Sequence, residues 1–131
     1  MPNFTAKLLV VDDDPWIVEI VCRMLTGNGY DVRNAFDGVE AVKMAEVFRP
    51  DCVVTGVVMP RMGGFQEAIA ILQVLPTCKF IFMSGCAHEP DIRMGHEQLG
   101  PDIGPLFEKP FKRLDLLNAL AAAGFPGLGN Q

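Results

Sequence analysis

Short apolar runs alternate with longer amphipathic segments along the chain. Continuous apolar runs are typical of β-strands covered on both faces, whereas apolar residues three or four apart are typical of helices with one buried side. The predicted strands are residues 7–11, 30–35, 52–55, 79–83 and 106–108. Five strands that alternate with helices indicate an α/β fold with a doubly wound parallel sheet and helices on both faces.

Capping and helix-breaking residues bound the predicted helices. Asp14 and Pro15 are typical of an N-cap and a first helical residue, and Gly27 ends the segment that they begin. Proline and glycine interrupt residues 86–105, so any helix within 90–99 should be short or irregular. The other helices are expected to begin at Asp37-Gly38 and to span 65–75 and 114–123.

Helical spacing also predicts which residues pack on the sheet. In the first helix they are Trp16, Ile17, Ile20, Val21, Met24 and Leu25. In the later helices they are Val39, Val42 and Ala45, then Ile69 and Leu72, then Leu116, Leu117 and Leu120. We expect one domain over residues 1–131, ordered over about 6–124, with Gly-rich residues 125–131 as a flexible tail.

Composition limits the classes of function. Half of the 131 residues are hydrophobic, which suffices for the core of one domain, and the net charge of -5 disfavours nucleic-acid binding. No apolar run reaches the roughly 18 residues of a membrane span, so we expect a soluble, cytoplasmic protein. The four cysteines lack a CxxC spacing and are expected to be free thiols.

Polar residues follow several predicted strands at their carboxyl ends, which meet at one edge of a parallel sheet. Asp12 and Asp13 follow the first strand, Ser84 the fourth and Lys109 the fifth, while Gly56 follows the third. Adjacent carboxylates suit Mg²⁺, and a lysine across the cleft supplies a cation for phosphoryl oxygens. The Ser84 hydroxyl is placed to donate to the same group.

In this arrangement the chain resembles the receiver domain of bacterial two-component response regulators. The resemblance covers about residues 6–123 and implies a flavodoxin-like (CheY-like) strand order of 2-1-3-4-5. The residues that carry it are Leu9-Val10-Val11-Asp12-Asp13 with Pro15, Met59-Pro60, Met62-Gly63-Gly64, Ser84 and Lys109-Pro110-Phe111.

The resemblance also implies roles for single residues. Asp12 and Asp13 correspond to the acidic pair that holds Mg²⁺, Ser84 to the hydroxyl that moves toward the phosphoryl group, and Lys109 to the lysine that pairs with it. The phosphoacceptor aspartate lies three residues before the Met-Pro pair, and here that residue is Gly56. Leu106 stands where the family often has an aromatic switch residue.

Glycine has no side chain that attacks a phosphohistidine or binds a metal, so the family's usual reaction is not available at residue 56. We therefore expect a pseudo-receiver, a binding module and not an enzyme, with weak Mg²⁺ binding at most because Lys109 neutralises the acidic pair. The expected partner is a protein, either a sensor histidine kinase or a downstream signalling protein, and a homodimer is left open.

Two other functions remain open. Gly56 can be a variant or engineered residue in a protein whose natural form is phosphorylated. A haloacid-dehalogenase-like phosphatase also has residues in the order of Asp12, Asp14, Ser84 and Lys109, although Trp16 departs from that family's pattern.

Three further features have simpler interpretations. Thr55 and Asp13 are poor substitutes for the missing acceptor. His88 and His96 lie on a segment broken by proline and glycine, and solvated surface is a better interpretation than a metal cluster.

Overall fold

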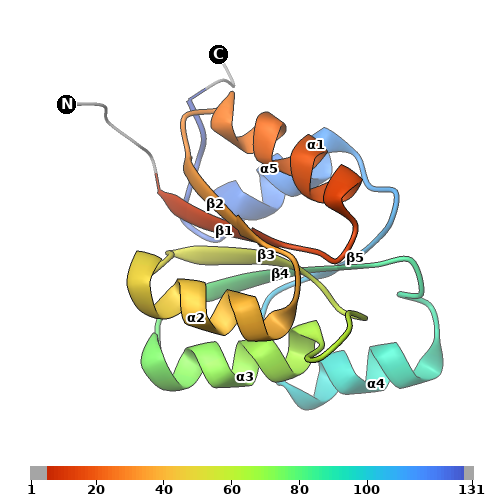
Figure 1. The fold of residues 1–131 in the computed structure, drawn as a ribbon. Helices are drawn as coiled ribbons and strands as arrows, with labels where there is room; N and C mark the ends of the chain where they lie inside the picture. The colour runs from red at the N-terminus through yellow and green to blue at the C-terminus, as the bar shows by residue number, and fades with distance from the viewer. Residues whose placement is uncertain (1–5, 129–131) are drawn as a thin grey trace.

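Five parallel strands form one sheet in the computed structural model, which describes residues 6–128. The strand order is β2-β1-β3-β4-β5, which confirms the predicted α/β fold and its order (Figure 1). The strands are β1 Lys7–Val11, β2 Asp31–Ala35, β3 Cys52–Gly56, β4 Lys79–Ser84 and β5 Leu106–Glu108. Gly56 and Ser84 are thus the last residues of their strands.

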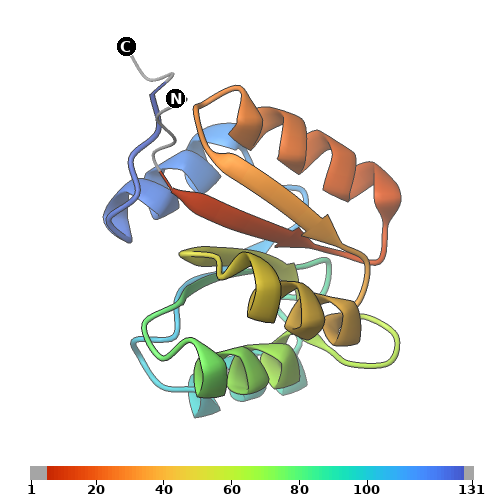
Figure 2. The ribbon, with the colours of Figure 1, turned by 60° about the vertical axis from the view of Figure 1, so that its left-hand side comes forward.

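Five helices cover the two faces of the sheet. They are α1 Pro15–Thr26, α2 Gly38–Phe48, α3 Gly64–Val74, α4 Pro90–Gln98 and α5 Arg113–Ala122. Figures 1 and 2 show α1 and α5 on one face and α2, α3 and α4 on the other. As the prolines and glycines predict, α4 is short, and none of its residues is fully buried.

Two hydrophobic clusters fill the space between the helices and the sheet. One lies under α2 and α3 and includes Val53, and the other lies under α1 and α5 and includes Val54. Because side chains alternate along a strand, Thr55 belongs to the α2 and α3 face and Gly56 to the α1 and α5 face. The end of β3 therefore meets different surroundings on its two sides.

Three apolar residues that the sequence places in the core are exposed. Trp16 is 67% exposed, Ile20 44% and Ile69 50%. Trp16 and Ile20 each lie two residues from the buried Val18, and Ile69 lies two residues from the buried Ile71. Two residues correspond to a rotation of about 200° around a helix, so these side chains point away from the core. Spacing predicted the helices correctly but was wrong at these three residues. It correctly predicted the buried Val21 and Leu25 of α1, Ala45 of α2, and Leu116, Leu117 and Leu120 of α5.

The residues after α5 contact the turn between α1 and β2. The Tyr30 hydroxyl donates to the Phe125 carbonyl, and the Leu128 amide donates to the Asn28 carbonyl at 2.8 Å. Residues 125–128 therefore have hydrogen-bond partners distant in sequence, and the flexibility expected of the tail stays a prediction. Residues 129–131 of that tail lie outside the described part.

The four cysteines are free thiols, as their spacing predicts, and Cys86 is the exposed one. Burial raises the pKa of the Cys78 thiol to about 12, which keeps that sulfur protonated and unreactive. Among the described residues, no helix combines the length and the apolar composition needed to cross a membrane.

Candidate functional site

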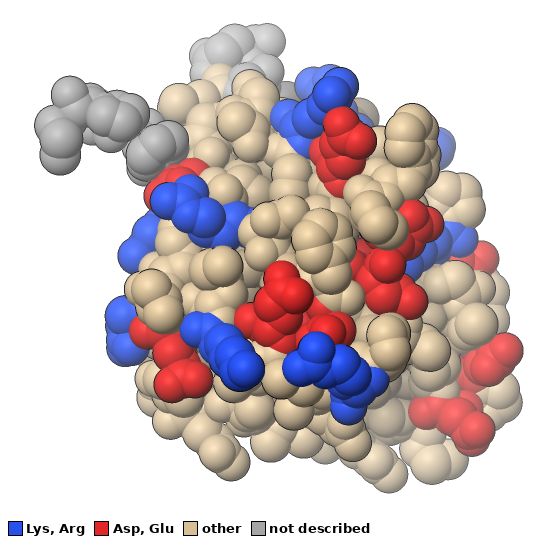
Figure 3. All heavy atoms as spheres, viewed as in Figure 1, with Lys and Arg blue, Asp and Glu red and all other residues tan. Residues whose placement is uncertain are grey.

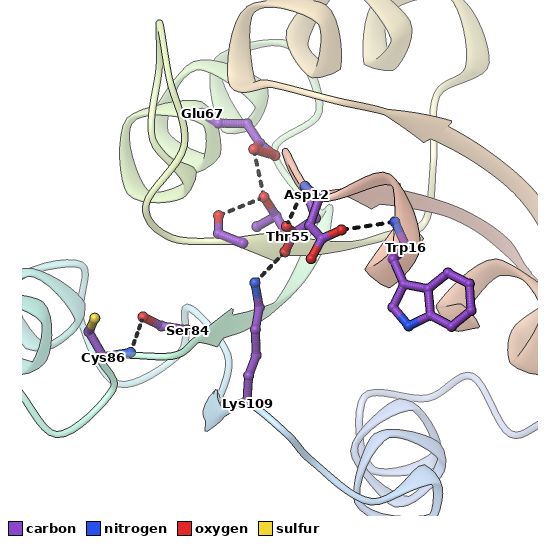
Figure 4. Close-up of polar contacts among 9 residues, drawn as sticks. Asp12, Trp16, Thr55, Glu67, Ser84, Cys86 and Lys109 are labelled. Atoms are coloured by element: carbon purple, nitrogen blue, oxygen red, sulfur yellow. Dashed lines mark hydrogen bonds and ion pairs between the residues drawn. The ribbon is translucent and has the colours of Figure 1, made fainter. Parts of the chain in front are cut away.

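The carboxyl edge of the sheet brings the predicted site residues together from four strands. Asp12 directly follows β1, Gly56 ends β3, Ser84 ends β4 and Lys109 directly follows β5. The pairing of β3 with β4 and of β4 with β5 fixes this arrangement, because Gly56 is opposite Met83 and Ser84 is opposite Glu108. Figure 4 shows Asp12, Ser84 and Lys109 at this edge.

Asp12 and Lys109 form an ion pair at the centre of the edge. Lys109 Nζ lies 2.6 Å from Asp12 Oδ2, and the side chains are 25% and 1% exposed, respectively. The other carboxylate oxygen of Asp12 accepts the Asp14 amide at 3.0 Å. Both oxygens of this buried carboxylate therefore have partners within the protein.

The other two aspartates of the run do not face Lys109 in the same way. Asp13 is exposed. Asp14 is the N-cap of α1, because its side chain accepts the Trp16 amide at 2.9 Å. A carboxylate in that position stabilises the first turn of the helix. The structure thus separates Asp12, which is paired in the interior, from two aspartates at the surface.

Gly56 lies against the Asp12 carboxylate. A Cβ atom on Gly56 would be 2.8 Å from Asp12 Oδ2, closer than a real Cβ contact. A side chain at residue 56 therefore requires Asp12 Oδ2 to move from the position in which it pairs with Lys109. The absent side chain leaves no free cavity here, because Asp12 occupies the space.

Ser84 is buried, and its side chain is engaged in the turn after β4. Its hydroxyl oxygen accepts the Cys86 amide at 3.0 Å, and Figure 4 shows it apart from the Asp12–Lys109 pair. The backbone of Lys109 donates to the Ser84 carbonyl at 2.9 Å, which holds the end of β5 beside β4. The hydroxyl serves as a turn cap in this conformation.

Leu106 and its neighbour face opposite sides of the sheet, as strand alternation requires. Leu106 packs against the cluster under α2 and α3, and Phe107 packs against the cluster under α1 and α5. Phe107 therefore does not replace the aromatic residue that the family often has at the position of Leu106.

A buried carboxyl on the α2 and α3 face is a feature that the sequence analysis did not find. Glu67 of α3 is fully buried, and its Oε1 lies 2.7 Å from the Thr55 hydroxyl. Burial raises the pKa of the Glu67 carboxyl to about 8, the hydrogen bond with Thr55 lowers it, and the nearby Asp37 raises it further. The signal in the sequence was its spacing, since Glu67 follows the buried Gly64 by three residues and precedes the buried Ile71 by four.

The two histidines have different surroundings. His88 is exposed and pairs with Glu108 at 2.6 Å. His96 differs from the solvated surface expected for it, because its ring contacts Phe65 and Phe82 and its Nε2 lies 2.6 Å from the Gly104 carbonyl. Within residues 6–128, no group of three or more His, Cys, Asp and Glu side chains is arranged to hold a metal ion.

A family comparison matches residues 8–121 to the response regulator receiver domain. The alkaline phosphatase synthesis transcriptional regulatory protein PhoP of Bacillus subtilis is 36% identical over 105 residues, 80% of this chain and 42% of PhoP. The response regulator MprA of Mycobacterium ulcerans is 47% identical over 62 residues, 47% of this chain and 27% of MprA. The chain thus spans less than half the length of these relatives.

Solved structures share the fold over nearly the whole chain. The chemotaxis response regulator CheY4 of Vibrio cholerae aligns with a TM-score of 0.80 and 29% identity, covering 90% of this chain and 98% of that one. The receiver domain of the sensor histidine kinase PA1611 of Pseudomonas aeruginosa aligns with a TM-score of 0.79 and 27% identity, covering 91% and 98%. That structure has a magnesium ion coordinated in its active-site cleft.

Proposed function

The chain belongs to the response regulator receiver domain family, and from this premise we propose that it is a pseudo-receiver that signals through protein contacts without phosphorylation at residue 56. Receivers of this family serve two-component signalling. At the carboxyl edge of the sheet, where the family has its phosphoacceptor aspartate, this chain has Gly56.

The contact between Asp12 and Gly56 carries the proposal. Glycine provides no carboxylate, and Asp12 Oδ2 occupies the space into which a side chain at residue 56 would extend. Lys109, which pairs with a phosphoryl group in the family, is 2.6 Å from the same oxygen. A site in which the lysine already neutralises a buried carboxylate has little attraction left for a phosphoryl group.

The arrangement also disfavours a resident Mg²⁺. Hard divalent cations need several oxygen ligands, and Mg²⁺ requires near-octahedral geometry. Here one oxygen of Asp12 accepts the Asp14 amide and the other meets Lys109, while Asp13 and Asp14 are exposed and the Asp14 side chain caps α1. The residues present therefore do not form the oxygen set that the ion requires.

The proposed partners are proteins. A sensor histidine kinase or a downstream signalling protein is the partner class that family membership supports, and a cytoplasmic location follows from that role. Figure 3 shows basic and acidic side chains interspersed on the face that it draws, with no continuous basic area there. This supports a protein partner over nucleic acid, which favours a basic surface.

Incubation with a small-molecule phosphodonor and Mg²⁺ tests the proposal, with the wild type and Gly56→Asp side by side. We expect no acid-labile phosphate on the wild type by intact-mass analysis. A stoichiometric acyl phosphate on the wild type would refute the proposal, and peptide mapping would then locate the acceptor.

The Gly56→Asp variant addresses a second candidate, a receiver whose natural form is phosphorylated and in which Gly56 is a substitution. Asp12, Ser84 and Lys109 at the carboxyl edge favour this candidate. Rapid phosphorylation of the variant would show that the rest of the pocket is competent, whereas an inert variant would support long divergence.

The phosphatase alternative receives less support. Asp14 would be its second catalytic aspartate, but the Asp14 side chain caps α1 through the Trp16 amide. We propose that the protein is not an enzyme, and turnover of a generic phosphate monoester would contradict this.

A further inference from the structure

The buried pair of Glu67 and Thr55 lies on the sheet face opposite Asp12. Figure 4 shows Glu67 extending from α3 toward Thr55 at the end of β3. Thr55 and Glu67 are both fully buried, and Glu67 Oε2 has no hydrogen-bond partner among the described residues. A carboxyl in such a place needs a physical explanation, because an unpaired buried charge is strongly destabilising.

The hydrogen bonds at Thr55 require a second proton. Thr55 Oγ1 lies 3.0 Å from the Gly56 carbonyl and 2.7 Å from Glu67 Oε1. A carbonyl and a carboxylate oxygen both accept, and a threonine hydroxyl has one proton to donate. Shared between two acceptors, that proton makes two weak contacts. Both contacts are full hydrogen bonds only if Glu67 is a neutral acid, whose Oε1 hydroxyl donates to Thr55 while Thr55 donates to Gly56.

The neutral acid also accounts for the unpaired oxygen. With the proton on Oε1, Oε2 is a carbonyl oxygen of an uncharged group. Leaving such an oxygen without a partner is less costly than leaving the oxygen of a buried carboxylate without one.

The charged groups around Glu67 do not stabilise its ionised form. Asp37, at the start of α2, is negative and raises the pKa of Glu67. Arg61 pairs with Asp37 at 3.2 Å and is not bonded to Glu67. Cys78, just before β4, has the pKa of its thiol raised by burial to about 12 and stays neutral. His96 of α4 faces Phe65 and Phe82. A proton is therefore what neutralises Glu67.

We propose that Glu67 is a proton-binding site that couples pH to the end of β3. When a base removes the carboxyl proton, Thr55 rotates its hydroxyl proton from the Gly56 carbonyl to the new carboxylate. Gly56 then loses that hydrogen bond, and a buried anion remains under α3 beside Asp37. Mildly alkaline pH thus loosens the contact between α3 and the strand end that carries residue 56.

This site does not depend on the proposed function. It uses the face of the sheet opposite Asp12 and Lys109, and no phosphoryl chemistry takes part. Its failure would leave the pseudo-receiver proposal unchanged, and phosphorylation of the wild type would leave the proton site unchanged.

A pH titration followed by NMR tests the proposal on the wild-type protein. We expect the Glu67 side-chain carboxyl carbon to titrate near its raised pKa of about 8. We expect the Gly56 carbonyl carbon and the Val57 amide nitrogen to titrate with the same midpoint, because they belong to the peptide group that loses the hydrogen bond. A Glu67 titration near the ordinary glutamate pKa would overturn the proposal, as would a Gly56–Val57 peptide group that does not respond.

Two substitutions at Thr55 separate the hydroxyl from its surroundings. Thr55→Val keeps the shape and removes the hydroxyl, so the response of the Gly56–Val57 peptide group should disappear. Thr55→Ser keeps the hydroxyl and should keep the response. An equal response in wild type and Thr55→Val would contradict the coupling, and the wild-type titration stands as a test even if a variant fails to fold.

Discussion

Replacement of the buried Glu67 by glutamine should stabilise the protein at neutral pH. Glu67→Gln keeps the shape of the side chain, and a glutamine amide donates to Thr55 as the neutral acid does. It removes the proton that the wild type must take up on folding and adds a second amide N–H, whose contribution does not depend on pH. The variant therefore isolates the free-energy cost of keeping this carboxyl neutral.

The magnitude follows from the two pKa values. The pKa of Glu67 is about 8 in the folded protein, against 4.5 for an ordinary glutamate. Because the folded pKa is the higher one, the stability from the bound proton is complete below pH 4.5 and is lost as pH rises toward 8. The loss is about 1.4 kcal/mol per pH unit in this window, so Glu67→Gln should be more stable than wild type by about 3 kcal/mol at pH 7.

Urea unfolding at about pH 5, 7 and 8.5 measures this difference. Other titrating groups contribute equally to both proteins, so the quantity of interest is the free energy of unfolding of the variant minus that of the wild type. It should be smallest at the lowest pH, where linkage contributes less than about 1 kcal/mol, and should increase with pH. Glu46→Gln, on the exposed side of α2, is the matched control and should give no such increase. A difference that is flat or decreases with pH would refute the reasoning.

Three further predictions concern the carboxyl edge. Lys109→Met leaves the buried Asp12 carboxylate without its cation and should lower the free energy of unfolding by about 2 to 3 kcal/mol. Lys43→Met, at an exposed position of α2, should have little effect in the same urea titration. Gly56→Ala places a Cβ 2.8 Å from Asp12 Oδ2 and should lower the free energy of unfolding by about 1 to 3 kcal/mol. Gly85→Ala is its control, because a Cβ there meets nothing within 4 Å. Equal effects of the two substitutions would show that the Asp12 contact is unimportant. Calorimetry should find Mg²⁺ affinity weaker than millimolar for the wild type and tighter for Gly56→Asp, and millimolar or tighter binding by the wild type would contradict the proposed site.

Most of the fold could be predicted from the sequence because the central strands β1, β3 and β4 are apolar on both faces, whereas the edge strand β2 is more polar. A buried parallel strand is a continuous apolar run, and turn residues separate each run from the next helix. The ends of β3 and β4 were each placed one residue early, because Gly56 and Ser84 are not apolar although both belong to the sheet. Residues at functional edges depart from the pattern that identifies the interior.

What the sequence did not show depends on contacts between distant residues. The exposure of Trp16 and Ile69 follows from the rotation of each helix on the sheet, which spacing alone does not fix. Glu67 looks like an ordinary surface residue of a helix until Thr55, which precedes it by twelve residues, is placed opposite it. The contact of Leu128 with Asn28 likewise joins two segments that are distant in sequence, which local patterns do not relate.

The end of β3 has unusual residues on both of its faces. On one face, Gly56 lets Asp12 approach the strand and pair with Lys109. On the other face, Thr55 connects the Gly56 carbonyl to the buried acid of Glu67. Restoring an aspartate at residue 56 changes the first set of contacts and leaves the second in place. If the protein responds to pH through Glu67, Gly56→Asp should keep that response even where it gains a phosphoryl acceptor, because the two sets of side chains share only the backbone of β3.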